Sequence, residues 1–340
     1  MTTRVFACIL ISLILALTVF GAPVEQNLEL FGAGASGGSN GAGSSGVTPV
    51  HSGTCGENLT WRLTPDGKLT IMGEGDMEWA SQSKIPWREY EDIIRNVIIE
   101  NGVTNIGENA FSSCRNLESV VIAQSVENIM KRAFYGCSIT EIEIPAGVKT
   151  IGEATFAHNP FTSIIIPESV TYIGNEAFRS CHELQRIDVD INNNHYSSDE
   201  NGVLFNKDKT VLIQYPIHNE KTAYKIPNSV ETILNHAFYE SNIESVVLPE
   251  GVTNIGDFAF YGCREIEEII IPGTVKSVGA ESFRHCRNLE SVTLQNGIES
   301  IGESAFFSCN NIESIFIPES VSSIGVGAFA CGKKDRKSVV

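Results

Sequence analysis

The sequence predicts an α/β solenoid: a right-handed coil with about ten short parallel strands on its concave face and an N-terminal capping hairpin. Three observations lead to this fold class. A phenylalanine recurs at spacings of 22 or 23 residues, an apolar segment with strand-like alternation follows it, and an aromatic, hairpin-like segment precedes the first repeat. A sustained period of this kind is typical of stacked supersecondary units, each of which buries its apolar face against its neighbours.

The repeat unit starts at residue 103 and reads V-x-x-I-G-x-x-A-F-x-x-C-x-x-L-x-x-I-x-I-P-x-x. The phenylalanines of its nine copies are Phe111, Phe134, Phe156, Phe178, Phe238, Phe260, Phe283, Phe306 and Phe329. The one long spacing, 60 residues after Phe178, holds a copy of 23 residues plus an insertion of 37. An L-x-x-I-x-I segment at this period is the signature of a leucine-rich-repeat solenoid.

Each part of the unit has a physical role. In the strand segment 117–122, alternation predicts that Val120 and Ile122 point inward and that Ser119 and Val121 point outward. The proline that follows in most copies lacks an N–H group and ends the strand. The glycine at the fifth position is expected to permit a turn that a Cβ would resist. The Ala-Phe pair is expected to open a short helical turn whose phenylalanine fills the core.

Residues 51–100 are predicted to form the N-terminal cap. Leu59, Trp61 and Leu63 alternate toward one side, and Leu69 and Ile71 lie opposite them across Pro-Asp-Gly, which is good turn chemistry. Trp79 and Trp87 add bulk before the first repeat strand. A solenoid needs such a cover over its first open coil.

The repeats are predicted to span residues 101–332, with a hairpin-bearing insert at 190–223. Residues 203–205 and 211–213 flank a polar turn and should pair as a second hairpin. We expect the insert to be one irregular coil in which this hairpin replaces the helical turn.

Both ends of the chain differ from the repeats. Residues 1–22, with Arg4 before an apolar run and small residues at 19 and 21, have the pattern of a cleaved secretory signal peptide. Residues 23–50 are rich in Gly, Ser and Ala and are expected to be a flexible linker. The segment matches G-x-G-x-x-G twice, but a dinucleotide-binding site needs a strand before this motif and a helix after it, and a linker offers neither. Residues 333–340 form a basic tail.

The charge balance limits the partners. With 41 Asp and Glu against 24 Lys and Arg, the net charge is −17, which argues against nucleic acid and anionic membranes as partners. No second apolar run is long enough for a membrane span, so none is expected after signal cleavage. Together with the signal-peptide pattern of residues 1–22, the absence of a second span predicts a protein that is secreted or held at the extracellular cell surface.

The outward strand positions are the candidate protein-binding residues. The apolar row and its continuation comprise Val121, Ile165, Val247, Ile270, Thr293 and Phe316. The acidic row beside it comprises Glu118, Glu244, Glu267, Glu290 and Glu313. In the apolar row, Ile98, Glu143, Asp188 and Lys225 fill the remaining positions. Such a surface is compatible with an ordinary sheet face, where β-branched residues are favoured, or with an interaction surface, since an apolar stripe beside charge is unusual on a monomer.

We identify no catalytic, cofactor-binding or metal-binding residues, so the sequence predicts no enzyme and no cofactor. No nucleophile–base pair is evident, and the seven histidines have no metal-ligand spacing. Asp188, Asp190 and Asn192, with Asp199, resemble half of a calcium loop, but Asn193 stands where such a loop requires glycine.

Six cysteines fall at the twelfth position of their copies, and Asn159 and Ser241 replace cysteine in two others. The six are Cys114, Cys137, Cys181, Cys263, Cys286 and Cys309. Two alternatives remain: a file of buried thiols packed as small apolar groups, or disulfides between adjacent coils, for example between Cys286 and Cys309. Asn58, in Asn-Leu-Thr, is a candidate N-glycosylation acceptor.

The repeats, the insert and the cap together resemble the BspA-like leucine-rich-repeat family of surface proteins. The resemblance covers residues 51–331 and includes Asn194-His195-Tyr196 in the insert and Thr54-Cys55-Gly56 in the cap. It implies display at the cell surface or secretion, protein recognition, and adhesion to host cells or extracellular matrix. It does not identify the partner.

Two functional hypotheses follow. The favoured one is a non-enzymatic recognition protein that binds other proteins through its concave face. The alternative is a structural coat protein that associates with itself, because the ninth copy stops near Gly332 before its strand and leaves Ile324 and Phe329 at an open end of the solenoid.

Overall fold

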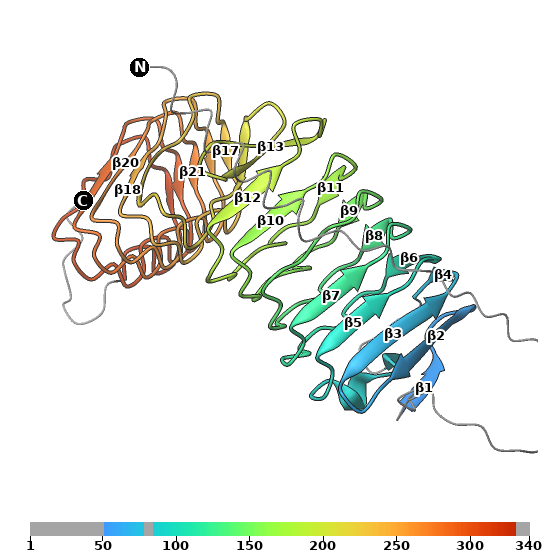
Figure 1. Cartoon of the computed structure of the whole chain (residues 1–340). Helices are drawn as coiled ribbons and strands as arrows, with labels where there is room; N and C mark the ends of the chain where they lie inside the picture. Colours follow the sequence, from blue (N-terminus) through green and yellow to red (C-terminus); the bar gives the residue numbers. More distant parts are fainter. Residues whose placement is uncertain (1–50, 78–83, 331–340) are drawn as a thin grey trace, which may run out of the picture. The chain divides into compact units, whose positions relative to one another are not determined.

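The computed structural model describes residues 51–77 and 84–330, and it is a β-solenoid of about ten coils (Figure 1). The signal peptide, the linker, Trp79 and the basic tail predicted from the sequence lie outside these residues. The predicted solenoid is confirmed, and its helical component is the main correction. Within the described residues helix is limited to 3-10 structure, at Lys84 and in the turn η2 (Arg88–Tyr90).

The cap is a three-stranded antiparallel unit made of β1 (His51–Thr54), β2 (Leu59–Leu63) and β3 (Lys68–Gly73). The hairpin between β2 and β3 pairs Trp61 with Ile71 and Leu63 with Leu69, and all four side chains are buried. Gly67 closes its turn at φ 84°, a conformation that glycine adopts without steric cost. β3 then pairs in parallel with the first repeat strand, so the cap continues directly into the solenoid.

The longer repeat strands line one face of the solenoid, which we call the long-strand face and which is the face predicted to be concave. Its strands are β5 (Asn96–Ile99), β7 (Ser119–Ile122), β10 (Ser163–Ile166), β12 (Arg186–Val189), β16 (Ala223–Lys225), β18 (Ser245–Val247), β20 (Glu268–Ile271) and β22 (Ser291–Leu294). Two of the ten predicted positions depart from a strand: Glu143 lies in irregular chain, and Phe316 makes a single bridge to Thr293.

A second set of parallel strands, which we call the second sheet, runs along the solenoid and consists mostly of two-residue strands; it is divided at the insert into two hydrogen-bonded sheets. It contains β4 (Gly75–Asp76), β6 (Val103–Ile106), β8 (Asn128–Ile129), β9 (Thr150–Ile151) and β11 (Tyr172–Ile173), and after the insert β17 (Thr232–Ile233), β19 (Asn254–Ile255), β21 (Ser277–Val278), β23 (Ser300–Ile301) and β24 (Ser323–Ile324). One residue of almost every strand points into the core, as Ile129, Ile151 and Ile255 do. These strands therefore form a second inward-facing segment in most coils.

The predicted helical turn at Ala-Phe is wrong, and the backbone explains why. In the first copy Asn109 and Ser113 have φ values of 57° and 66°, and the equivalent residues of later copies share this left-handed conformation. L-residues do not continue an α-helix through that conformation. The N–H groups of Asn109, Phe111 and Ser113 instead donate to carbonyls of the next coil at 2.7–3.0 Å, while Ser112 N donates to Asn109 O within its own coil. This segment is thus a third hydrogen-bonded row along the solenoid.

The phenylalanines form a stacked ladder through the core, with centroid distances between successive rings of 4.6–6.1 Å. This is the range in which aromatic pairs attract each other. The cap supplies the first ring, because Trp87 stacks on Phe111 at 5.4 Å and donates from Nε1 to Ala110 O. The ladder stops at Phe178, and Tyr215 starts a second one. The buried side chains likewise form two clusters, which are divided within the insert near Leu204.

The insert contains the predicted hairpin and one further strand. β14 (Leu204–Asn206) pairs antiparallel with β15 (Val211–Gln214) and with β13 (Tyr196–Ser198). β15 also pairs in parallel with β17, so the hairpin occupies a place in the second sheet. The prediction that the hairpin replaces the turn is therefore wrong. A shortened turn at Tyr215 replaces the usual one, and Tyr215 N donates to Ala237 O.

The repeat glycines are needed for packing between coils and not for a special turn. A Cβ on Gly174 would lie 2.4 Å from Glu153 N, and one on Gly152 would lie 2.5 Å from Lys131 N. Met130 replaces this glycine in one copy, yet Arg132 keeps the left-handed φ of 54° two residues later. The glycine therefore lets one coil approach the backbone of the preceding coil.

Candidate protein-binding surface

The outward-facing apolar side chains of the long-strand face are exposed although they lie between buried neighbours. Val121, Ile165 and Ile270 are 60%, 64% and 55% exposed, and Phe316 is 76% exposed. The burial pattern of β7, β10, β20 and β22 alternates strictly between exposed and buried. The inward residues anchor each strand in the core, and the outward residues are left as a row on the surface.

The register places these residues side by side. Ile98 pairs with Val121, Ile165 with Asp188, and Lys225 with Val247. Ile270 pairs with Thr293, which bridges to Phe316. The predicted row therefore exists as four in-register segments, because one residue of each strand meets the same position of the next coil.

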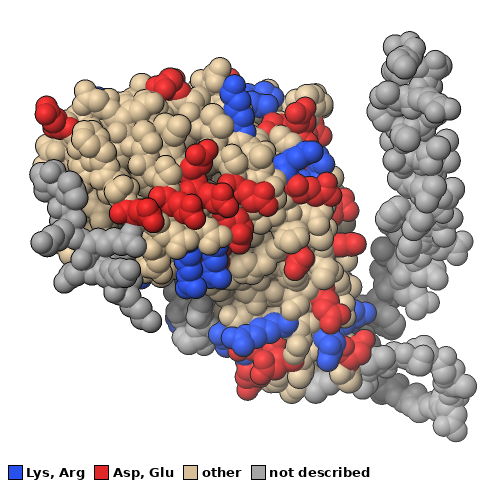
Figure 2. All heavy atoms as spheres, turned by 90° about the vertical axis from the view of Figure 1, so that its left-hand side faces the viewer, with Lys and Arg blue, Asp and Glu red and all other residues tan. Residues whose placement is uncertain are grey.

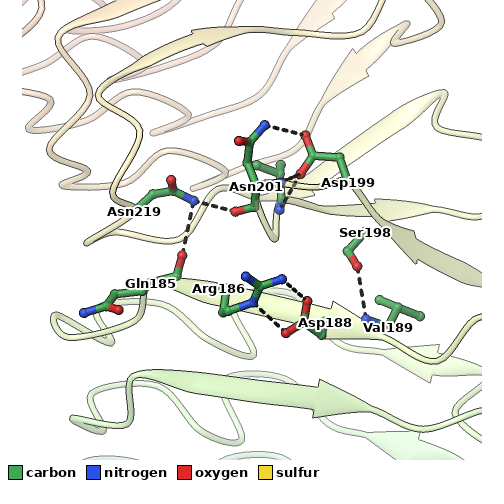
Figure 3. Close-up of polar contacts among 9 residues, drawn as sticks. Gln185, Arg186, Asp188, Val189, Ser198, Asp199, Asn201 and Asn219 are labelled. Atoms are coloured by element: carbon green, nitrogen blue, oxygen red, sulfur yellow. Dashed lines mark hydrogen bonds and ion pairs between the residues drawn. The ribbon is translucent and has the colours of Figure 1, made fainter. Parts of the chain in front are cut away.

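Charged residues interrupt the row in its middle. Glu143 lies in the coil without a strand, and Asp188 accepts two hydrogen bonds from Arg186 at 2.6 and 2.7 Å (Figure 3). This bidentate pair raises the pKa of Arg186 through its hydrogen bonds and charge. Lys225 follows in β16. The long-strand face thus has an apolar stretch on either side of a polar centre.

Four of the five acidic-row residues lie along the C-terminal half of this face, and Glu118 lies in the N-terminal half. Glu244, Glu267, Glu290 and Glu313 are all exposed, and each precedes the strand segment of its coil. Figure 2 turns the side that carries β18 and β20 toward the viewer and shows acidic side chains gathered in a band. Carboxylates in this arrangement give the surface a negative field that selects the charge of a partner.

A recess lies next to the N-terminal part of the apolar row. It is an open depression with a volume of about 520 Å³ at the carboxyl ends of β5 and β7, and Ile99, Val121 and Gln124 are among its lining residues. Its lining combines apolar and amide groups with the carboxylate of Glu100, and it is open, whereas small-molecule sites enclose most of the ligand surface.

Buried amides of the insert fix the centre of the long-strand face, and no sequence pattern predicts them. Asn219 donates from Nδ2 to Gln185 O and Asn201 O at 3.2 and 2.7 Å (Figure 3). Asn193, which is fully buried, donates to Pro167 O and Val170 O and accepts from the N–H groups of two following residues. Both amides connect the insert to the coils before it.

The carboxylates that resemble half of a calcium loop have protein partners and do not converge. Asp188 pairs with Arg186, and Asp190 accepts from Asn192 N at 2.9 Å. Asp199 accepts from Asn201 N, Val203 N and Tyr224 Oη (Figure 3 shows its contacts with Asn201). Burial and this bond to Asp199 raise the pKa of Tyr224. Across the described residues, no group of three or more His, Cys, Asp or Glu side chains is placed to hold a metal ion.

The cysteines at the twelfth repeat position are buried and bond to the preceding coil. Cys137 Sγ donates to Phe111 O at 3.1 Å, and Cys181, Cys263, Cys286 and Cys309 make the equivalent bond at 3.0–3.2 Å. Asn159 makes the same contact from Nδ2 to Phe134 O at 2.7 Å, which explains why an amide can replace the thiol. Burial raises the pKa of Cys114, Cys181 and Cys263 to about 12.

The last described coil is less covered than those before it. Ile324 is 48% exposed, whereas its register partner Ile301 is 2% exposed. Val326 is 81% exposed, and Phe329 is half-buried although it stacks on Phe306.

Asn58, the candidate glycosylation acceptor, is exposed in the cap.

No helix among residues 51–77 and 84–330 has the length and apolar character required to span a bilayer. No curated protein matches the chain. Among solved structures, a leucine-rich-repeat protein from Eubacterium ventriosum is 28% identical with a TM-score of 0.71, over 81% of this chain and 84% of that one. A leucine-rich cell surface protein from Faecalibacterium prausnitzii is 26% identical with a TM-score of 0.54, over 81% and 94%.

The pneumococcal vaccine antigen PcpA is 19% identical with a TM-score of 0.60, over 83% of this chain and 86% of that one, and it supports the fold alone. The protein-family model that describes the BspA-type leucine-rich-repeat region matches residues 89–201 and 218–334 of this chain, in six copies. These two ranges cover most of the chain and leave out part of the insert, where the repeat pattern is broken. The chain therefore belongs to the BspA-type leucine-rich-repeat family.

Proposed function

We propose that this chain is a non-enzymatic recognition protein, secreted or displayed at the cell surface, that binds other proteins through its long-strand face. The observation that carries the proposal is the row of exposed apolar side chains held in register by the parallel strands. Removing such a row from water on binding gives roughly 25 cal/mol per Å² of apolar area. Proteins of this family are typically interaction scaffolds, and one similar structure is described as a cell surface protein.

We further propose that the partner is a host-cell surface or extracellular-matrix protein and that the role is adhesion. The family membership and the signal-peptide pattern of residues 1–22 support this. The domain plan expected from the sequence, with a linker at 23–50 and a tail at 333–340, would leave the solenoid free to present its face. Asn58, exposed in the cap, would be a glycosylation site if the chain passes through a glycosylating pathway.

The test is binding of the full chain to a panel of purified matrix proteins, measured by biolayer interferometry. We expect at least one to bind, and we expect Ile270→Asp and Phe316→Asp to weaken that binding about tenfold or more, because each places a charge in an apolar contact. Tyr172→Asp is the matched control, since Tyr172 is 55% exposed but lies in the second sheet. Circular dichroism should be unchanged in all three variants.

Unchanged binding by both long-strand variants, with the control also unchanged, would reject this face as the binding surface. Localisation is tested separately by antibody labelling of intact cells and by a blot of the culture medium. Signal that is present only after permeabilisation would reject secretion and display.

A second candidate function is self-association through the last coil. The exposure of Ile324, against the burial of Ile301 at the same position, favours it. We expect Ile324→Asp to reduce any dimer detected by sedimentation velocity. A monomer at all concentrations of the unaltered chain would reject this candidate.

A further inference from the structure

The two halves of the long-strand face differ in charge at the position that starts each strand segment. In the N-terminal half, Glu118 lies 3.9 Å from Arg95 in an ion pair, and the next three equivalent residues are Thr140, Thr162 and Gln185. In the C-terminal half the equivalent residue is Thr222 in the coil of β16, and the next four are glutamates: Glu244, Glu267, Glu290 and Glu313. Within the described chain none of these four forms an ion pair.

The glutamates stand at the same position of adjacent coils. Glu290 N donates to Glu267 O at 2.8 Å, so their backbones are direct neighbours. Neighbouring strands are about 4.8 Å apart, and like charges in this arrangement repel each other. Exposed Arg264 and Arg287 lie three residues earlier in their coils without pairing to this row. Within the described residues, no basic side chain forms an ion pair with this line of carboxylates.

An apolar row runs parallel to this line. Val247 and Ile270 follow Glu244 and Glu267 by three residues on the same strand segments, and Phe316 follows Glu313 in the same way. They are 51%, 55% and 76% exposed. Three residues of strand span about 10 Å, so the apolar row and the acidic row are parallel strips separated by about that distance.

We propose that the C-terminal half of the long-strand face binds a basic amphipathic helix of a partner protein, laid along the solenoid axis. Its apolar side chains would pack on the row of Val247, Ile270 and Phe316, and its Lys or Arg side chains would meet the acidic row. This inference rests on the proposed function and specifies the chemistry of its partner.

The spacing favours a helix over an extended segment. Successive turns of an α-helix rise by about 5.4 Å, against about 4.8 Å between coils, so the mismatch over four coils stays near 2 Å. Alternate residues of an extended strand are about 6.7 Å apart and lose register with the coils within two steps. A helix about 10 Å in diameter also reaches both strips at once.

The test uses a synthetic amphipathic peptide of about 18 residues, with a leucine stripe flanked by lysines, and fluorescence anisotropy with the full chain. A peptide of the same composition in scrambled order is the control for amphipathicity. We expect the amphipathic peptide to bind more tightly than the scrambled one. We also expect binding to weaken between about 50 mM and about 500 mM NaCl, since exposed charges are screened over that range.

Two sets of variants locate the site. Replacing Glu244, Glu267, Glu290 and Glu313 by Gln should weaken peptide binding at least about fivefold, because it removes four exposed ion pairs with the peptide lysines, each of modest strength. The matched control replaces four exposed glutamates outside the row by Gln, namely Glu57, Glu74, Glu183 and Glu303, and removes the same charge. It should change binding less than about twofold.

Ile270→Ser with Phe316→Ser should abolish peptide binding, whereas Val121→Ser with Ile165→Ser should leave it unchanged. Three outcomes overturn the inference. In the first, the amphipathic peptide binds no more tightly than the scrambled one. In the second, the two sets of glutamate variants weaken binding equally. In the third, Val121→Ser with Ile165→Ser reduces peptide binding as much as Ile270→Ser with Phe316→Ser does. Each leaves the proposed function standing if a matrix protein still binds in a manner that depends on the long-strand face. Failure of that matrix-protein experiment would instead reject the proposed function itself.

Discussion

Tyr215 stacks on Phe238 with a centroid distance of 4.8 Å and an interplanar angle of 21°, and so takes the place of a repeat phenylalanine in the irregular coil. Its hydroxyl donates to Lys221 O, which holds the chain as it returns from the insert to β16. Burial raises the pKa of this phenol, so the hydroxyl remains a donor at all ordinary pH values. One residue therefore starts the second aromatic ladder and also anchors the insert.

Tyr215→Ala should destabilise the chain by about 3–5 kcal/mol, the usual cost of deleting a buried aromatic ring. Tyr215→Phe keeps the ring and should cost only about 1 kcal/mol for the lost hydrogen bond and the unpaired carbonyl. Urea unfolding measures both values. Equal losses in the two variants would mean that the hydroxyl, and not the ring, holds the junction.

Gly174→Ala should be poorly tolerated because the new Cβ would lie 2.4 Å from Glu153 N and 2.6 Å from Gly152 C. Both contacts are to backbone, so adjacent coils would have to separate. Gly136→Ala is the comparison, since a Cβ there meets nothing within 4 Å and only its φ of 66° is unfavourable. We expect roughly 1 kcal/mol for Gly136→Ala and clearly more for Gly174→Ala in thermal or urea unfolding. The reverse order would contradict the close-approach explanation.

Alkaline pH should destabilise the solenoid through its buried thiols. Burial raises the pKa of Cys181 to about 12, so above the unfolded pKa of about 8.5 the unfolded chain loses a proton that the folded chain keeps. This contribution to stability is complete below that pH and decreases as pH rises. Cys181→Ser retains a donor to Phe156 O, but the serine hydroxyl does not titrate between pH ~8 and ~10. In this range the substitution should reduce the slope of the unfolding free energy against pH by up to about 1.4 kcal/mol per pH unit. An unchanged slope in this variant would contradict the prediction.

Acidic pH should destabilise the junction between the two core clusters through His236. This side chain stacks on Phe258 at 4.9 Å, and its Nδ1 lies 3.5 Å from Glu176 Oε1 of the coil before the insert. Desolvation lowers its pKa, an effect that Arg179 reinforces and that Glu176 and Asp257 partly oppose.

Because the unfolded chain takes up this proton first, stability should fall as pH decreases through about 6.5. His236→Phe should reduce the loss measured by unfolding at pH ~7.5 and ~5, whereas His218→Asn, at an exposed position, should not. An equal pH dependence in the unaltered chain and His236→Phe would reject this assignment.

Alternation and period made much of the fold predictable. Leu59, Trp61 and Leu63 are buried as their spacing required, and Val121 and Ile270 are exposed for the same reason. Side chains alternate between the two faces of any strand, so an apolar residue at an outward position stays outward once its neighbours are fixed in the core. The candidate binding row was readable from the sequence on this basis.

Other features could not be read locally. The left-handed residues of the turn include Asn109, Arg132 and Phe258, which share no side-chain property that marks such a conformation. Their backbone is fixed by hydrogen bonds to the next coil, which is distant in sequence. Asn193 and Asn219 looked like ordinary loop residues because an amide reveals its role only when buried carbonyls surround it.

The sequence by itself determined that this chain is a solenoid, where its coils begin, which side chains face inward and which glutamates share a row. Those properties follow from a period and an alternation that are written along the chain. Only the tertiary structure decided that Trp87 and Tyr215 complete the aromatic ladders, that glycines serve close packing, and that Arg186 pairs with Asp188 at the centre of the long-strand face. The Arg186–Asp188 pair lies within β12 and depends on how two neighbouring side chains turn toward each other. The other features depend on contacts between separate coils, whose geometry is set by the stacking of the whole array.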